Sequence, residues 1–173
     1  MDQNSYDEAL AFARTYHAGQ VRKFAAWPYE RPYIEHPIAV ADMVMKYFEA
    51  AGYEDDDAIV AAILHDVVED TIITIEDVER EFSANVAKYV WFLSDAPNLI
   101  GNRALRNTMT KYRLCLAPDV VKIIKYFDIK HNLVSIRLYD PKFYIVFSKE
   151  KAELLETIGI ADVALNGVKV ANF

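Results

Sequence analysis

The stretch that best indicates the fold of this chain is Ala61-Ala62-Ile63-Leu64-His65-Asp66-Val67-Val68-Glu69-Asp70-Thr71. An apolar run from Ala58 to Leu64 leads into the His65-Asp66 pair, so we expect a helix that carries this pair out of the core. If the helix continues, Glu69 and Asp70 lie one turn beyond the pair on the same face. Four ionisable groups so close together are costly without a cation. The stretch therefore predicts a divalent metal such as Mn, Fe or Zn, with carboxylates that can accept a proton from its bound water.

Two other positions fit the same site. His36 directly precedes Pro37, which suits the first turn of a helix. Asp128 and Asn132 lie four residues apart among apolar neighbours, so we expect this pair to face a buried site. A His-Asp dipeptide alone is a weak signal, and an acidic cluster is usually a solvated face. The joint arrangement of His36, the pair and Asp128 favours a metal centre.

Helical periodicity dominates the rest of the chain, which predicts an all-α fold. We expect one domain over residues 1–173, a compact helical bundle with the metal site between central helices. Thr74 with Asp77 resembles a capping box, and Ser83 a helix N-cap. Residues 25–32 and 95–102 are expected to be loops. The expected helices span about 5–16, 37–50, 55–65 and beyond, 83–93, 103–116, 118–135 and 142–158.

Composition limits the function classes. The chain has 173 residues, of which 53% are hydrophobic and 26% charged, so it can bury a substantial core. Its one cysteine, Cys115, excludes a disulfide scaffold and a cysteine-based zinc site. We see no signal peptide or membrane span and expect a cytoplasmic location. The net charge of −7 argues against broad nucleic-acid binding, but a local basic patch can still hold a small anionic substrate.

The wider sequence resembles the HD superfamily of metal phosphohydrolases, and within it the hydrolase domain of the RelA/SpoT homologues, especially the free-standing small alarmone hydrolases. The matching blocks are His17 to Lys23, Tyr33 to Pro37, Ala61 to Thr71, and Asp128 with His131-Asn132. The resemblance implies an HD-domain helical bundle that binds one manganese ion. It also implies hydrolysis of the 3′-pyrophosphate of guanosine tetra- or pentaphosphate.

The same resemblance implies a role for each matching residue. The metal ligands are His36, His65, Asp66 and Asp128, and the acidic pair that handles the attacking water is Glu69 with Asp70. Nucleotide contacts come from Arg22, which stacks on the base, and from Lys23, Asn132 and Ser135. Lys122, Lys125 and Lys130 are candidates to extend the basic patch, although not all three can point inward.

The chain also departs from the family pattern. The link from Phe24 to Arg31 is longer than usual, Phe127 and Ile129 replace a small residue and an arginine, and the segment from Gly101 to Leu114 fits poorly. We expect these departures to lie near the nucleotide pocket. Adenosine alarmones and the 3′-pyrophosphorylated end of tRNA, in an antitoxin role, therefore stay open as substrates. A generic HD nucleotide phosphomonoesterase and a non-catalytic regulatory module are the alternative functions. The sequence indicates neither the oligomeric state nor a protein partner.

Overall fold

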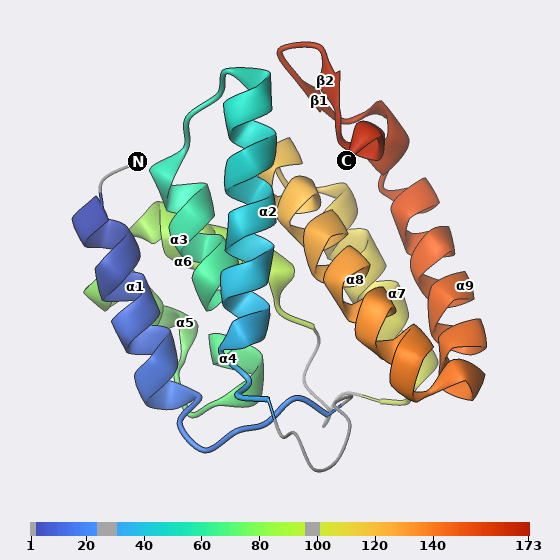
Figure 1. Cartoon of the computed structure of the whole chain (residues 1–173), viewed down its shortest axis with the longest axis horizontal. Coiled ribbons are helices and arrows are strands. Elements are labelled where there is room, and N and C mark those ends of the chain that lie inside the picture. Colours follow the sequence, from blue (N-terminus) through green and yellow to red (C-terminus); the bar gives the residue numbers. More distant parts are fainter. Residues whose placement is uncertain (1–2, 24–30, 96–100) are drawn as a thin grey trace.

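The molecule is a bundle of helices with a short β-hairpin near its C-terminal end (Figure 1). The structure is a computed structural model that describes residues 3–23, 31–95 and 101–173. Its helices are α1 (Gln3–Tyr16), α2 (Glu35–Ala51), α3 (Asp56–Leu64), α4 (Val67–Asp70), α5 (Ile75–Glu81), α6 (Ala84–Leu93), α7 (Arg103–Cys115), α8 (Asp119–Tyr139) and α9 (Pro141–Thr157). A short antiparallel hairpin, β1 (Ala164–Leu165) with β2 (Val168–Lys169), lies between two 3₁₀ turns, η1 (Ile160–Asp162) and η2 (Val170–Asn172). The all-α prediction is confirmed.

Helix α3 forms the centre of the core. Every residue from Ala58 to Leu64 is buried, as expected for a helix that is apolar on all sides. Asp55 caps its start by accepting a hydrogen bond from the Ala58 backbone N–H at 2.9 Å. Helices α1, α2 and α6 pack against it. The His65-Asp66 pair therefore leaves the core at the end of a rigid, buried element.

Helix α8 brings a distant part of the chain to the same place. It packs between α2 and α9, and Figure 1 shows these three helices side by side on one half of the molecule. Phe127 and Ile129 are buried in the core, where the Phe127 ring packs 6.1 Å from the Tyr47 ring. The expectation was that these two departures from the family pattern lie near the nucleotide pocket, but both side chains are core residues and neither is among the described residues that line the cavity at Arg22 and His36.

Most predicted helix ends are confirmed, because their capping groups are local. Thr74 and Asp77 form the capping box of α5, and the Ser83 side chain accepts a hydrogen bond at the start of α6. Helix α8 runs four residues beyond its expected end, to Tyr139. Residues 25–30 and 96–100 of the two expected loops lie outside the described part of the chain. No helix within that part is both long and apolar enough to cross a membrane.

The helix that contains the central motif does not continue through it. Helix α3 ends at Leu64, His65 and Asp66 lie between two helices, and α4 begins at Val67. In an unbroken helix, successive side chains point about 100° apart. The break lets neighbouring His65 and Asp66 face one point, and Glu69 and Asp70 then follow on a separate short helix.

Candidate active site

Three predicted metal ligands converge at the first turn of α2. His36, His65 and Asp66 each offer one ligand atom, and these atoms lie within 4.8 Å of one another. The His65 Nε2 atom lies 3.0 Å from Asp66 Oδ2 and 3.3 Å from His36 Nε2. The His36 Nε2 atom lies 3.6 Å from Asp66 Oδ2. Both imidazoles are buried, so the cluster lies inside the protein rather than on a solvated face.

Asp128 adds a fourth donor from α8. Its Oδ1 atom lies 3.1 Å from His36 Nε2 and 3.8 Å from His65 Nε2. Neighbouring donors around an ion bound at about 2.0–2.2 Å are separated by about 3.0–3.5 Å. The His36, His65 and Asp66 donors therefore fit one divalent ion in spacing, and Asp128 adds an oxygen donor of suitable type beside the two histidines.

The histidine tautomers suit metal binding. His65 Nδ1 lies 2.8 Å from the Ala62 carbonyl oxygen, to which it donates, so neutral His65 presents its Nε2 lone pair to the cluster. His36 Nδ1 lies 2.7 Å from His131 Nδ1. Burial and the nearby His36 lower the pKa of His131 to about 4, so His131 is neutral and can accept this hydrogen bond in the tautomer that carries its proton on Nε2. In that arrangement His36 Nδ1 is the donor, which leaves the His36 Nε2 lone pair for a metal.

The ionisable groups of the centre lie close enough to shift one another's pKa. Burial lowers the pKa of His36, which keeps this imidazole neutral. Burial also opposes protonation of His65, but Asp66 and Asp128 outweigh it and raise the His65 pKa to about 9. Burial would raise the pKa of Asp66, but His65 lies so close that the pKa falls below its ordinary value. Without a metal, the centre therefore holds one proton on His65 between two ionised carboxylates.

Lys125 is a buried cation at this site. The sequence predicts that it extends the basic patch for the substrate. Its Nζ atom lies 3.0 Å from Asp128 Oδ2, opposite the oxygen that faces the histidines. Burial would raise the pKa of Asp128, but the Lys125 ammonium outweighs it and holds this pKa far below its usual range. Lys122 pairs with Asp119, and Lys130 lies over the Tyr126 ring. The prediction that these lysines extend a phosphate-binding patch is therefore wrong for Lys125, which pairs with Asp128, a predicted metal ligand.

Glu69 and Asp70, the predicted water-handling pair, lie on α4 beside the cluster. Glu69 Oε2 accepts a hydrogen bond from the Asp95 backbone N–H at 3.0 Å. Burial and the Asp95 carboxylate raise the pKa of Glu69 to about 7. Burial and Asp66 raise the pKa of Asp70. A carboxyl group that titrates near neutral pH is suited to both accept and return a proton.

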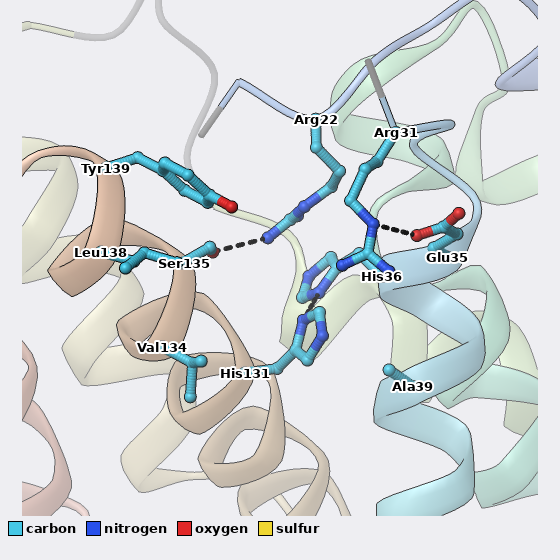
Figure 2. Close-up of a pocket in the computed structure, with 10 residues that line it drawn as sticks. All are labelled: Arg22, Arg31, Glu35, His36, Ala39, His131, Val134, Ser135, Leu138 and Tyr139. Atoms are coloured by element: carbon cyan, nitrogen blue, oxygen red, sulfur yellow. Dashed lines mark hydrogen bonds and ion pairs between the residues drawn. The ribbon is translucent and has the colours of Figure 1, made fainter. Parts of the chain in front are cut away.

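Of the predicted nucleotide-binding residues, Arg22 and Ser135 line one cavity, and Asn132 contacts Arg22 beside it. Arg22 donates to Asn132 Oδ1 at 2.8 Å and to Ser135 Oγ at 3.3 Å. Asn132 in turn donates to Asp128 Oδ1 at 2.7 Å, which links this group to the predicted metal ligands. Lys23 is exposed beyond Arg22. The cavity has a volume of about 300 Å³, and Figure 2 shows Arg22 reaching across it toward Ser135 on α8.

Several residues of the site were not assigned a role from the sequence. The Tyr33 hydroxyl donates to Asp66 Oδ2 at 2.5 Å, and His131 and Asp95 contact His36 and Glu69. Lys125 lies three residues before Asp128 on the same helix face, so this spacing is the sequence feature that could have predicted their ion pair. Asp95 follows α6 and has no local sequence feature that predicts its contact, because Glu69 lies 26 residues before it in the chain.

Comparisons with known proteins agree with this geometry. An HD domain family model matches residues 9–136. The chain is 34% identical over 146 residues to guanosine-3′,5′-bis(diphosphate) 3′-pyrophosphohydrolase of Haemophilus influenzae, covering 82% of this chain and 20% of that relative. It thus spans about a fifth of that longer protein. It is 33% identical over 135 residues to the enzyme of the same name, MESH1, of Xenopus tropicalis, covering 78% of this chain and 71% of that relative.

A solved structure extends the similarity to the fold. The structure of a metazoan SpoT orthologue that hydrolyses ppGpp aligns with a TM-score of 0.77 and 26% identity. The alignment covers 99% of this chain and 94% of the orthologue. The chain therefore belongs to the HD-domain family, as a homologue of the SpoT and MESH1 (p)ppGpp hydrolases.

Proposed function

We propose that this chain is a manganese-dependent 3′-pyrophosphohydrolase that converts guanosine tetra- or pentaphosphate to GDP or GTP and pyrophosphate. The observation that carries the proposal is the convergence of His36, His65 and Asp66, with Asp128 beside the two histidines and Glu69 on the adjoining helix α4. The names of the relatives support the substrate. We further propose that residues 1–173 act as one HD domain.

The proposed roles follow from the donor types. The four ligands would hold one divalent ion, which supplies Lewis-acid chemistry and lowers the pKa of a bound water. Tyr33 orients Asp66 through its hydroxyl, and Lys125 fixes Asp128. Nitrogen and carboxylate donors also suit iron and zinc, so the choice of manganese rests on the family resemblance.

Glu69 is the proposed general base and acid. In this step the water oxygen forms a bond to the phosphorus attached to the ribose 3′ oxygen, and the bond between that phosphorus and the 3′ oxygen breaks. Glu69 accepts the water proton, which is then passed to the 3′ oxygen of the departing nucleotide, GDP or GTP. Pyrophosphate is released with the water oxygen. A pKa near 7 lets one carboxyl group serve both transfers.

A substrate panel with Mn²⁺ tests the proposal. The panel is guanosine tetraphosphate, its adenosine analogue, tRNA with a 3′-pyrophosphate, and guanosine monophosphate, with products separated by anion-exchange chromatography. We expect GDP and pyrophosphate in equal amounts from guanosine tetraphosphate, loss of turnover with excess chelator, and no turnover by His65→Ala.

Each other outcome of the panel points to one alternative. Release of orthophosphate from guanosine monophosphate would favour a generic phosphomonoesterase. Faster cleavage of the tRNA would favour the antitoxin function. The absence of any turnover with added Mn²⁺, Fe²⁺ or Zn²⁺ would favour a non-catalytic module. Full activity in excess chelator would contradict the metal-dependent mechanism.

A further inference from the structure

A second arginine lies at the rim of the nucleotide cavity. Arg31 is the last residue of the link from Phe24 to Arg31, which is longer than the corresponding link in the family. It lines the cavity together with Arg22. An antiparallel bridge between Val21 and Pro32 joins the two segments, and the Arg22 backbone N–H donates to the Arg31 carbonyl oxygen at 2.9 Å. The two arginines are therefore presented side by side by a fixed backbone rather than by independent loops.

The side chain of Arg31 is oriented but keeps most of its donors. Its Nε lies 2.9 Å from Glu35 Oε2, and the side chain is 67% exposed. A guanidinium has five N–H groups in a fixed fork, so the contact through Nε leaves the Nη donors for another anion. Figure 2 shows this guanidinium above the His36 and His131 rings, at the cavity edge opposite Ser135. Glu35 thus holds the arginine in place as a docking point for an anion.

The residues that line the cavity also indicate how a substrate would be oriented in it. Among the described residues that line it, His36 is the one candidate metal ligand, so the scissile group belongs at the His36 end. The walls beyond include the apolar side chains of Ala39, Val134 and Leu138. A nucleotide bound this way places its uncharged parts against those walls. Its remaining phosphates, which are strongly hydrated, then belong on the solvent side of the buried His36 ring, where the exposed Arg31 side chain lies.

We propose that Arg31 binds the 5′-phosphates of the substrate and thereby selects nucleotides that carry phosphates on both the 3′ and 5′ oxygens. This inference rests on the proposed function and names the feature that its substrate must have. A terminal 5′-phosphate can accept two parallel hydrogen bonds from a guanidinium. The 5′ oxygen of a tRNA terminal nucleotide lies in a phosphodiester of single charge, which is a poorer partner. Arg31 therefore favours free alarmones over a nucleic-acid end.

The test pairs a protein variant with a shortened substrate. Wild type and Arg31→Gln are compared on guanosine tetraphosphate and on guanosine 3′-diphosphate, which lacks the 5′-phosphates. We expect Arg31→Gln to raise KM for the tetraphosphate about tenfold, the size of one charge-assisted contact at an exposed rim, with kcat unchanged. KM for guanosine 3′-diphosphate should change less than about twofold. Lys88→Gln makes the same charge change on an exposed part of α6 and should alter neither KM.

Two results would overturn the inference. An unchanged KM for the tetraphosphate in Arg31→Gln would show that the 5′-phosphates bind elsewhere. An equal rise for both substrates would show that Arg31 holds the 3′ group instead. Titration calorimetry of both nucleotides with Mn²⁺-loaded Glu69→Gln, with and without Arg31→Gln, gives the same comparison without turnover. If wild type hydrolyses neither nucleotide, the proposed function fails, and the binding comparison still decides the role of Arg31.

Discussion

Metal binding at this centre should release the proton that His65 holds. The Asp66 and Asp128 carboxylates raise the His65 pKa to about 9 against the opposing effect of burial. A protonated imidazole has no Nε2 lone pair for a metal, so the ion must displace that proton. His36 is kept neutral by burial, and both carboxylates are already ionised, so His65 is the one ligand that must change state.

The size of the effect follows from the pKa. At pH 7 a group with a pKa of about 9 is protonated about 100-fold more often than not, so the apparent metal affinity should lie about 100-fold below its high-pH limit. Raising the pH removes the competing proton. The affinity should therefore rise about tenfold per pH unit between pH 6 and 8 and level off above the His65 pKa.

Isothermal titration calorimetry measures both quantities. Mn²⁺ is titrated into metal-free protein at pH 7 in two buffers of different ionisation enthalpy, and the difference in apparent heat gives the protons released. Titration into buffer alone supplies the reference. We expect about one proton per ion bound, with a Kd that falls as pH rises. Binding without proton release, together with a Kd that is flat from pH 6 to 8, would refute the coupling between His65 and the metal.

Three substitutions test other parts of the site. Glu69→Gln should lower kcat about 10²–10⁴-fold while metal content stays at wild type, and wild-type turnover would contradict its role in proton transfer. Lys125→Met leaves the buried Asp128 carboxylate without its ammonium partner. Chemical denaturation of the metal-free protein should therefore show that the free energy of unfolding falls by about 3–5 kcal/mol. Lys122→Met, from a more exposed pair, should lose at most about 1 kcal/mol, and equal losses would remove the special role of Lys125. Arg22→Lys should raise KM for guanosine tetraphosphate more than it changes kcat, because lysine cannot reproduce a planar contact with the base. An unchanged KM there would mean that the base is held elsewhere.

The parts of the fold that follow from local chemistry could be predicted from the sequence. Thr74, Asp77 and Ser83 cap helices through groups three residues away, and the run from Ala58 to Leu64 needs no information beyond its own composition to be placed in the core. The end of α3 could not be predicted in this way. The apolar pattern predicts that the helix continues past Leu64. In the structure α3 ends there, and the break before α4 lets the His65 and Asp66 side chains face the same point.

The contacts between distant segments could be predicted only in part. His36 and Asp128 lie 92 residues apart in the chain, and the packing of α2 on α8 brings their donor atoms to 3.1 Å. Charge type alone suggested a phosphate partner for Lys125. The packed structure gives it the Asp128 carboxylate, because a buried cation is stable only beside a counter-charge.

Anomalous diffraction from crystals grown with Mn²⁺ tests the central claim most directly, because it locates the ion without reference to activity. We predict one manganese peak per chain, with His36 Nε2, His65 Nε2, Asp66 and Asp128 at about 2.0–2.4 Å. A peak at another place, or a peak at this place that Asp128 does not contact, would contradict the proposed centre and the mechanism built on it.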